Sequence, residues 1–96
     1  MDIRNNEENL QFEYHENGEV ARLEYRFYKK SIALMHTVVP KSLQGKGIAS
    51  ALAAEAFKFA KEKNKQVMIY CPFVSKYIQK HPELKSQIDR DYHPNL

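Results

Sequence analysis

The stretch VVPKSLQGKGIASAL, Val38 to Leu52, contains the change of pattern on which the fold depends. An apolar run ends at Pro40, which cannot donate to a sheet ladder. A polar turn with Gly45 and Gly47 follows, and then a helical pattern begins. Glycines let another group approach the backbone closely, and the first turn of a helix adds unpaired N–H groups and the positive end of its dipole. The stretch therefore predicts a strand, a tight turn and a helix that together can hold an anion.

Upstream of this stretch, the chain has the two-residue alternation of β-strands. Residues 10–15 and 20–28 alternate apolar with polar side chains, which predicts an antiparallel sheet with one buried and one solvent-exposed face. Asn17-Gly18 between them is a strong hairpin signal because both residues tolerate positive φ. Residues 32–39 are apolar on both faces, as expected of a central strand.

Downstream, the apolar period becomes that of a helix, from Gly47 to about Asn64. Three further segments follow, a buried strand, a short helix that starts at a proline and another turn or two of helix: residues 66–71, 72–80 and 81–88. Residues 89–96 carry no clear signal. The predicted fold is α+β, with the order β-β-β-α-β-α, a mixed and mostly antiparallel sheet, and one long helix after the glycine loop.

Length and composition exclude several classes of protein. The 96 residues predict one domain, residues 1–96, and a single cysteine excludes an intrachain disulfide or a multi-cysteine metal site. No apolar run is long enough to span a membrane, and the polar, acidic N-terminus is unlike a signal peptide, so we expect a cytoplasmic protein without a membrane partner. No pair of carboxylates or histidines has metal-ligand spacing.

The net charge of +3 is too small to indicate nucleic-acid binding by itself. Six lysines do fall in or after the glycine loop: Lys41, Lys46, Lys58, Lys61, Lys63 and Lys65. Such clusters are usually solvated faces, and no aromatic residues are interleaved with basic ones as in nucleic-acid-binding surfaces. We therefore expect no nucleic-acid partner.

Three known glycine-loop patterns can be compared with this loop. The Walker A pattern fails because the spacing and the magnesium-binding hydroxyl are absent, and the dinucleotide pattern fails because its third glycine would be Ser50. The pattern Q/R-x-x-G-x-G/A is the one that fits, with its small residues at 45, 47 and 49. A tight turn without any ligand remains the alternative for Gly45 and Gly47.

On these residues the sequence resembles the GNAT superfamily of acetyl-CoA-dependent acyltransferases, and in particular its short single-domain branch, the YjdJ-type predicted acetyltransferases. The resemblance covers about residues 10–83 and rests on HTVVP…LQGKGIASAL followed by CPFVSKYIQKHPE. It implies a minimal GNAT-like fold with acetyl-CoA or coenzyme A as cosubstrate. Larger members carry one or two helices between their first strands, and here only tight turns stand in those places.

The resemblance also implies where coenzyme A would bind. Backbone N–H groups of the loop and first helical turn would hold the pyrophosphate: Gln44, Gly45, Lys46, Gly47, Ile48 and Ala49. Lys41 or Lys46 can meet a phosphate as well. The pantetheine arm would run along the strand that ends at Val38 and Val39, so that the thioester reaches the gap beside Cys71.

Cys71 is the candidate nucleophile. Pro72 favours an extended Cys71 at the N-cap of a helix, where the positive helix end makes a thiol more nucleophilic. The alternative is a small buried hydrophobic residue that ends a strand. His36 shares the alternating face of Ile32, Leu34 and Val38, so it is either a core residue or a base that takes a proton from the amine or from Cys71.

Two further candidate residues fall on the short helices after Cys71. Tyr77 and His81, the latter in the His81-Pro82 pair, can line the cleft, although amphipathic packing explains Tyr77 equally well. His15 and His93 are expected to be bystanders. The predicted function is acetyl transfer to a primary amine of a small molecule, peptide or protein lysine, with a coenzyme A-binding module or sensor without efficient transfer as the alternative. The sequence does not indicate an oligomeric state.

Overall fold

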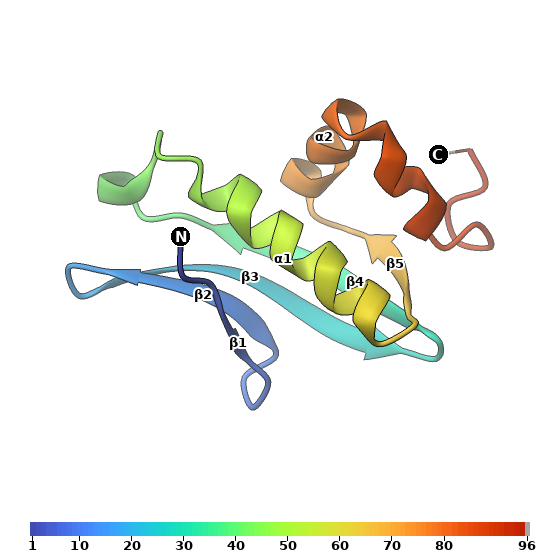
Figure 1. Ribbon diagram of the computed structural model, residues 1–96, viewed down its shortest axis with the longest axis horizontal. Helices are drawn as coiled ribbons and strands as arrows, with labels where there is room; N and C mark the ends of the chain where they lie inside the picture. The colour runs from blue at the N-terminus through green and yellow to red at the C-terminus, as the bar shows by residue number, and fades with distance from the viewer. Residues whose placement is uncertain (96) are drawn as a thin grey trace.

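The computed structural model describes residues 1–95 as one sheet with helices on one of its sides (Figure 1). The chain contains these elements in order: β1 (Arg4–Asn6), β2 (Gln11–Glu16), β3 (Glu19–Tyr28), β4 (Ser31–Val38), η1 (Lys41–Leu43), α1 (Ile48–Glu62), β5 (Gln66–Ile69), α2 (Pro72–Lys80) and η2 (Pro82–Gln87). This confirms the α+β class and the minimal GNAT-like arrangement. Among residues 1–95, no helix is both long and apolar enough to cross a membrane.

The five strands lie in the sheet in the order of the chain, β1-β2-β3-β4-β5. All neighbours are antiparallel except β4 and β5, which are parallel because α1 carries the chain from the end of β4 back to the start of β5. The predicted hairpin between β2 and β3 is confirmed, with Asn17 and Gly18 at φ 52° and 77°. The sheet is therefore mixed and mostly antiparallel, as predicted.

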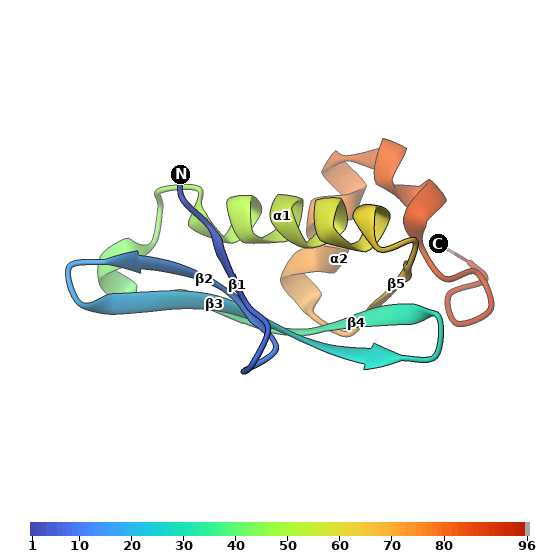
Figure 2. The same cartoon turned by 60° about the horizontal axis from the view of Figure 1, so that its bottom comes forward.

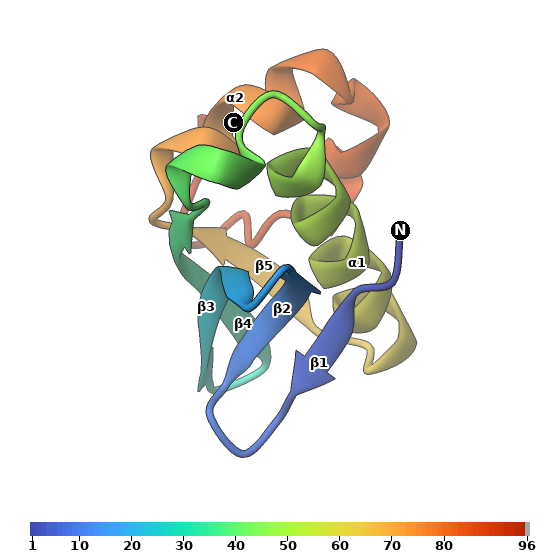
Figure 3. The same cartoon turned by 90° about the vertical axis from the view of Figure 1, so that its left-hand side faces the viewer.

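The core lies between α1, α2 and one face of the sheet. Figures 2 and 3 show both helices on the same side, and no helix formed by residues 1–95 lies on the opposite face. The apolar stripe of α1 is buried against strands β2 to β5: Ile48, Leu52, Ala53, Ala56, Phe57 and Ala60. Full burial of one leucine side chain contributes about 1.5–3 kcal/mol, so this stripe fixes α1 on the sheet. We call the uncovered side the open face.

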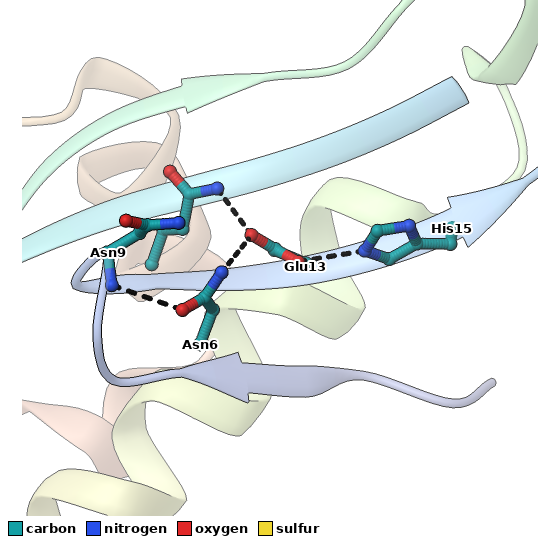
Figure 4. A network of polar contacts seen from close by, with 5 residues as sticks. Asn6, Asn9, Glu13 and His15 are labelled. Carbon is teal, nitrogen blue, oxygen red and sulfur yellow. Dashed lines mark hydrogen bonds and ion pairs between the residues drawn. The ribbon is translucent and has the colours of Figure 1, made fainter. Parts of the chain in front are cut away.

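The strand β1 was missed by the sequence analysis, which placed three strands before the long helix. Its residues, Arg-Asn-Asn, are polar and have no apolar alternation. Figure 4 shows a side-chain bond that links it to β2: Asn6 Nδ2 donates to Glu13 Oε2 at 2.9 Å, and Gln11, which is also in β2, binds the same oxygen. His15 Nε2 lies 2.8 Å from Glu13 Oε1. Burial raises the pKa of Glu13, but the bonds from Gln11, His15 and Asn6 outweigh it and hold the pKa below its usual value.

The end of the described chain, where the sequence pattern carries no clear signal, packs beside β5. Ile88 bridges to Val67, and Asp89 N–H donates to the Val67 carbonyl at 2.9 Å. The buried carboxylate of Asp89 accepts from Ser31 Oγ at 2.6 Å, and this bond is the main reason for its lowered pKa. The segment after η2 therefore covers the outer edge of β5 and ties it to the start of β4.

Candidate active site

The glycine loop connects β4 to α1. After η1, both Gly45 and Gly47 adopt left-handed backbone conformations, with φ 80° and 78°. Gly47 is the N-cap of α1, and no side chain caps this helix end. The first intrahelical bond runs from Ala51 N–H to the Gly47 carbonyl at 3.1 Å, so the N–H groups before Ala51 have no helical acceptor. The loop thus presents several backbone donors at the positive end of a 15-residue helix.

Two side chains of the loop have partners elsewhere in the chain. Gln44 Nε2 donates to the Val39 carbonyl at 3.1 Å, which ties the loop to the end of β4. Lys46 Nζ lies 2.6 Å from Glu16 Oε2 in the β2–β3 hairpin, and this contact raises the pKa of Lys46. Lys41 has no ion-pair partner within residues 1–95. Of the two lysines predicted to meet a phosphate, Lys41 is therefore the one with an unengaged ammonium group.

A hollow of about 220 Å³ lies over this loop, and we call it the loop hollow. Its lining combines the loop, the first turn of α1 and the start of α2: Val39, Leu43, Gln44, Gly45, Gly47, Ile48, Ala49, Ser50 and Phe73. A Cβ atom added at Gly45 or Gly47 would have no protein atom within 4 Å, so both glycines leave space open above the backbone. The structure therefore brings together most of the residues predicted to bind the cofactor.

The strands β4 and β5 separate beside this hollow. Their parallel ladder covers Ser31 to Leu34 of β4 and ends at Ile69 of β5. The Leu34 carbonyl accepts from both Tyr70 and Cys71 N–H groups, at 3.0 and 3.1 Å, and the chain then turns into α2. Within residues 1–95, the strand β4 continues to Val38 with only β3 as its neighbour. The edge of Met35–Val38 therefore faces a gap, and Val39 follows at the end of this edge.

A β-bulge in β4 changes the predicted face of His36. Tyr25 pairs with Leu34, but Glu24 pairs with His36, so Met35 is an extra residue on this strand. One extra residue moves every later side chain to the other face. His36 consequently lies on the open face opposite Glu24 and is exposed, not on the face of the buried Leu34. The placement of His36 on the core face was therefore wrong, because the alternation was counted straight through the bulge.

Thr37 takes the inward position instead. It pairs with Leu23, which is buried in the core, and its Oγ1 lies 3.0 Å from Cys71 Sγ. Cys71 is 3% exposed and is the N-cap of α2, with Pro72 at the first helical position, as predicted. The sequence analysis missed Thr37 because only the bulge brings it to the thiol. The thiol and the hydroxyl thus form a pair at the gap, on the helical side of the sheet.

Tyr77 lies on α2, on the helical side of the sheet. Its ring packs against Phe57 of α1, with 6.4 Å between ring centroids, and against His81, with 4.2 Å. Burial is the main cause of its raised pKa, and the carboxylate of Glu83 adds to it. Tyr77 therefore packs on α1, as amphipathic packing predicts, and it also lines a hollow described below, while its role in the cleft stays a prediction. The structure places Tyr77 and Cys71 on the helical side and His36 on the open face.

His93, expected to be a bystander, contacts the end of β5. Its Nε2 accepts a hydrogen bond from Ile69 N–H at 2.9 Å, so in this arrangement the ring proton is on Nδ1. Burial lowers the pKa of His93, which favours the neutral ring that this bond requires. A hollow of about 350 Å³ contains both His93 and Cys71 in its lining. No periodic or motif signal in residues 89–95 points to this contact.

Comparisons with known proteins agree with this geometry. The sequence profile of the family described as GCN5-related N-acetyl-transferase matches residues 11–88. Protein NATD1 of Mus musculus is 32% identical over 83 residues, which are 83% of this chain and 76% of that protein. Protein NATD1 of Gallus gallus is 32% identical over 85 residues, 85% of this chain and 77% of that protein.

A shorter match has higher identity. Protein NATD1 of Xenopus tropicalis is 37% identical over 54 residues, which are 56% of this chain and 50% of that protein. The aligned part thus spans half of the frog protein and about three quarters of the mouse and chicken proteins. The profile match extends from β2 to the residue after η2, so it includes the glycine loop, the strand gap and α2.

Proposed function

Because the chain belongs to the GCN5-related N-acetyltransferase family, as its motifs predicted, we propose that it transfers an acetyl group from acetyl-CoA to a primary amine. The observation that supports this proposal most directly is the loop hollow, where backbone N–H groups of α1 that have no helical acceptor lie next to the end of β4. A nucleotide-linked thioester needs both features, an anion site for its phosphates and a path from there to the reacting atoms.

The loop fits the pyrophosphate of coenzyme A. A phosphate needs backbone donors that it can approach closely, and the open space above Gly45 and Gly47 allows that approach. The donors would be N–H groups of residues 45–49, because the N–H group of Gln44 already donates to the Lys41 carbonyl at 3.3 Å. The free ammonium group of Lys41 can add a charged contact. The ammonium group of Lys46 stays with Glu16, so Lys46 would contribute through its backbone.

The unpaired edge of β4 fits the pantetheine arm. An amide-bearing chain can pair with a free strand edge as an added strand does. Met35–Val38 faces the gap for four residues, and this edge leads from Val39 at the loop hollow toward Cys71. The acetyl group of acetyl-CoA supplies the carbonyl carbon that a nucleophile attacks, and the arm would place this carbon beside Thr37 and Cys71.

We assign Cys71 the role of nucleophile in this reaction. Its sulfur attacks the thioester carbonyl, the bond between the acetyl group and the coenzyme A sulfur breaks, and coenzyme A leaves with the proton that Cys71 lost. The amine then attacks the acetyl carbon on Cys71, and its proton returns to the Cys71 sulfur. Thr37 Oγ1, 3.0 Å from Sγ, holds the thiol at the gap during both steps.

Intact-mass measurement tests this route. After incubation with acetyl-CoA, we expect one acetyl adduct that hydroxylamine removes, and its position is unambiguous because Cys71 is the one cysteine in the chain. Cys71→Ser should lose the adduct but keep coenzyme A binding in a calorimetric titration. Incubation with free coenzyme A is the control. Amine acetylation at full rate by Cys71→Ser would show that the amine attacks the thioester directly.

His36 has a place in that direct route. It lies on the open face, where an amine can reach the strand gap from the side without helices (Figure 2). Its cross-strand neighbour is Glu24, whose pKa is lowered mainly by the hydrogen bond from Arg22 and to a smaller extent by His36. In the direct route His36 would take the proton of the amine, with the charged Glu24 carboxylate stabilising the imidazolium.

The shape of the open face indicates which kind of acceptor amine it can hold. A shallow hollow of about 440 Å³ lies there beside the strand gap, lined by side chains that are mostly aromatic or sulfur-containing: Arg26, Phe27, Tyr28, Ala33, Met35, Met68, Tyr70 and Tyr92. No element within residues 1–95 closes over it, whereas small metabolites need most of their surface enclosed. An exposed amine, such as a lysine side chain, a protein N-terminus or a polyamine, fits this face better.

A coenzyme A-binding module without efficient transfer is the second candidate. The uncovered open face favours it, because the larger family members that the sequence resembles carry helices on the acceptor side. The two candidates differ in one measurement. A module would bind coenzyme A and acetylate neither Cys71 nor any amine in a panel of peptides, polyamines and free metabolites.

A further inference from the structure

A second hollow adjoins the loop hollow, and we call it the α2 hollow. It measures about 320 Å³ and is lined by one residue of α1, five of α2 and the residue that follows α2: Ser50, Phe73, Lys76, Tyr77, Gln79, Lys80 and His81. Ser50 and Phe73 line both hollows. A ligand held at the glycine loop can therefore extend into the α2 hollow without leaving the protein surface.

The charge of the α2 hollow is mainly positive. Lys76 and Lys80 are exposed, lie one helical turn apart and have no ion-pair partner within residues 1–95. One carboxylate lies at the rim, since Glu83 Oε2 is 3.5 Å from His81 Nδ1. The two unpaired ammonium groups leave this hollow suited to an anion with more than one negative charge.

Aromatic rings form the wall between the two helices. The ring of Tyr77 lies 6.4 Å from that of Phe73 at 29° and 4.2 Å from that of His81 at 31°. Phe57 of α1 packs on Tyr77 at 23° and fixes its position. Such rings offer a flat apolar surface against which a nucleobase can stack.

We propose that the α2 hollow binds the 3′-phosphorylated adenosine of coenzyme A, with Lys76 and Lys80 contacting the 3′-phosphate and Tyr77 the adenine. The inference rests on the proposed function. The pyrophosphate joins the pantetheine arm to the adenosine, so an arm that follows β4 leaves the adenosine to extend the other way from the glycine loop. Ser50 and Phe73, which line both hollows, connect the glycine loop to the α2 hollow that would receive the adenosine. The protein is thereby selective for coenzyme A over 3′-dephospho-coenzyme A.

Calorimetric titration with these two ligands tests the proposal. We expect wild-type protein to bind coenzyme A about tenfold more tightly than 3′-dephospho-coenzyme A, because two charge-assisted contacts are involved. In Lys76→Gln/Lys80→Gln the preference should fall to about twofold or less, with the affinity for 3′-dephospho-coenzyme A unchanged. The matched control is Lys58→Gln/Lys61→Gln, which removes the same charge from exposed positions of α1 outside both hollows.

Two further variants separate phosphate from base recognition. Glu83→Gln removes the rim carboxylate and should increase the preference for coenzyme A about twofold. Tyr77→Leu should weaken both ligands equally, because both contain adenine, and its melting temperature without ligand shows whether the fold is kept. Equal weakening by Tyr77→Leu supports the assignment of the adenine, and unchanged binding of both ligands overturns it.

The outcomes for the inference and for the proposed function differ. If both ligands bind the wild type equally, or if the lysine pair and its α1 control change the preference alike, the α2 hollow does not bind the 3′-phosphate. Coenzyme A binding as such would then still stand. If neither ligand binds the wild type, the inference and the proposed function are both wrong.

Discussion

Replacing Gly47 by alanine adds one methyl group at the mouth of the loop hollow. The new Cβ would meet no protein atom within 4 Å, so any steric effect must fall on a ligand. The backbone at Gly47 has φ 78°, and an alanine in this left-handed region costs about 1 kcal/mol. For a chain of this length, that cost lowers the melting temperature by about 4–8 °C in the absence of ligand.

Gly18 provides a matched control in the β2–β3 hairpin. Its φ is 77°, and its Cβ would also meet nothing within 4 Å. Gly18→Ala should therefore lose the same about 4–8 °C through the same backbone strain. The two variants differ in one respect, since Gly47 lines the loop hollow and Gly18 does not.

Thermal melting with and without coenzyme A measures the difference. At a hundredfold excess over its Kd, a ligand adds about 2.7 kcal/mol, which corresponds to roughly 10–20 °C here. We expect this shift in the wild type and in Gly18→Ala, but a much smaller one in Gly47→Ala, with affinity reduced at least about tenfold because the methyl group displaces the pyrophosphate from its donors. Equal ligand-induced shifts in the two variants would refute binding at the glycine loop.

Two further predictions concern the strand gap. Thr37→Val removes the hydroxyl 3.0 Å from Cys71 Sγ, so acetylation of Cys71 should slow about fivefold with little change in coenzyme A affinity, and Thr37→Ser should restore the acetylation rate. If intact-mass measurement of samples quenched at successive times gives the wild-type rate for Thr37→Val, Thr37 has no part in positioning the thiol. Burial lowers the pKa of His93 in the folded protein, so the unfolded chain binds more protons, and the free energy of unfolding should fall as the pH drops below about 6.5. The loss should reach about 1 kcal/mol once the bond from Ile69 N–H is broken, as measured by urea unfolding at pH 7.5 and 5.5, whereas His93→Gln, which still offers an acceptor, should have similar stability at both pH values.

Sequence patterns predicted the parts of the fold where apolar periodicity and turn chemistry agree. The alternation in β2 and β3, the Asn17-Gly18 hairpin and the stripe of α1 are such parts, and they are confirmed. The strand β1 could not be predicted because its residues have no apolar alternation: its ladder to β2 and side-chain bonds from Asn6 to Glu13 and from Tyr25 to Asn5 hold it in place.

The residues of the candidate site also fall into two groups, those that local sequence rules predict and those that they do not. The glycine loop and the N-cap position of Cys71 follow from local rules for glycine and proline and were predicted. The exposure of His36 and the contact of Thr37 with Cys71 depend on one unpaired residue in β4, for which the sequence has no signal. The contact of His93 with Ile69 joins segments 24 residues apart. The single-domain extent and the cytoplasmic location remain predictions.

The bulge at Met35 decides which side chain of β4 meets the thiol. A chain that kept Met35 but paired without the bulge would place His36 opposite Leu23 and Thr37 opposite Arg22, so that the two residues exchange faces. The imidazole would then lie on the side of the thiol, and the hydroxyl would face the solvent. Deletion of Met35 would instead remove the bulge and leave the next two residues opposite Glu24 and Leu23, as they are now. When relatives are compared position by position, a one-residue gap here therefore preserves the site. Two chains with the same His-Thr pair present different chemistry to Cys71 when one of them forms the bulge and the other does not.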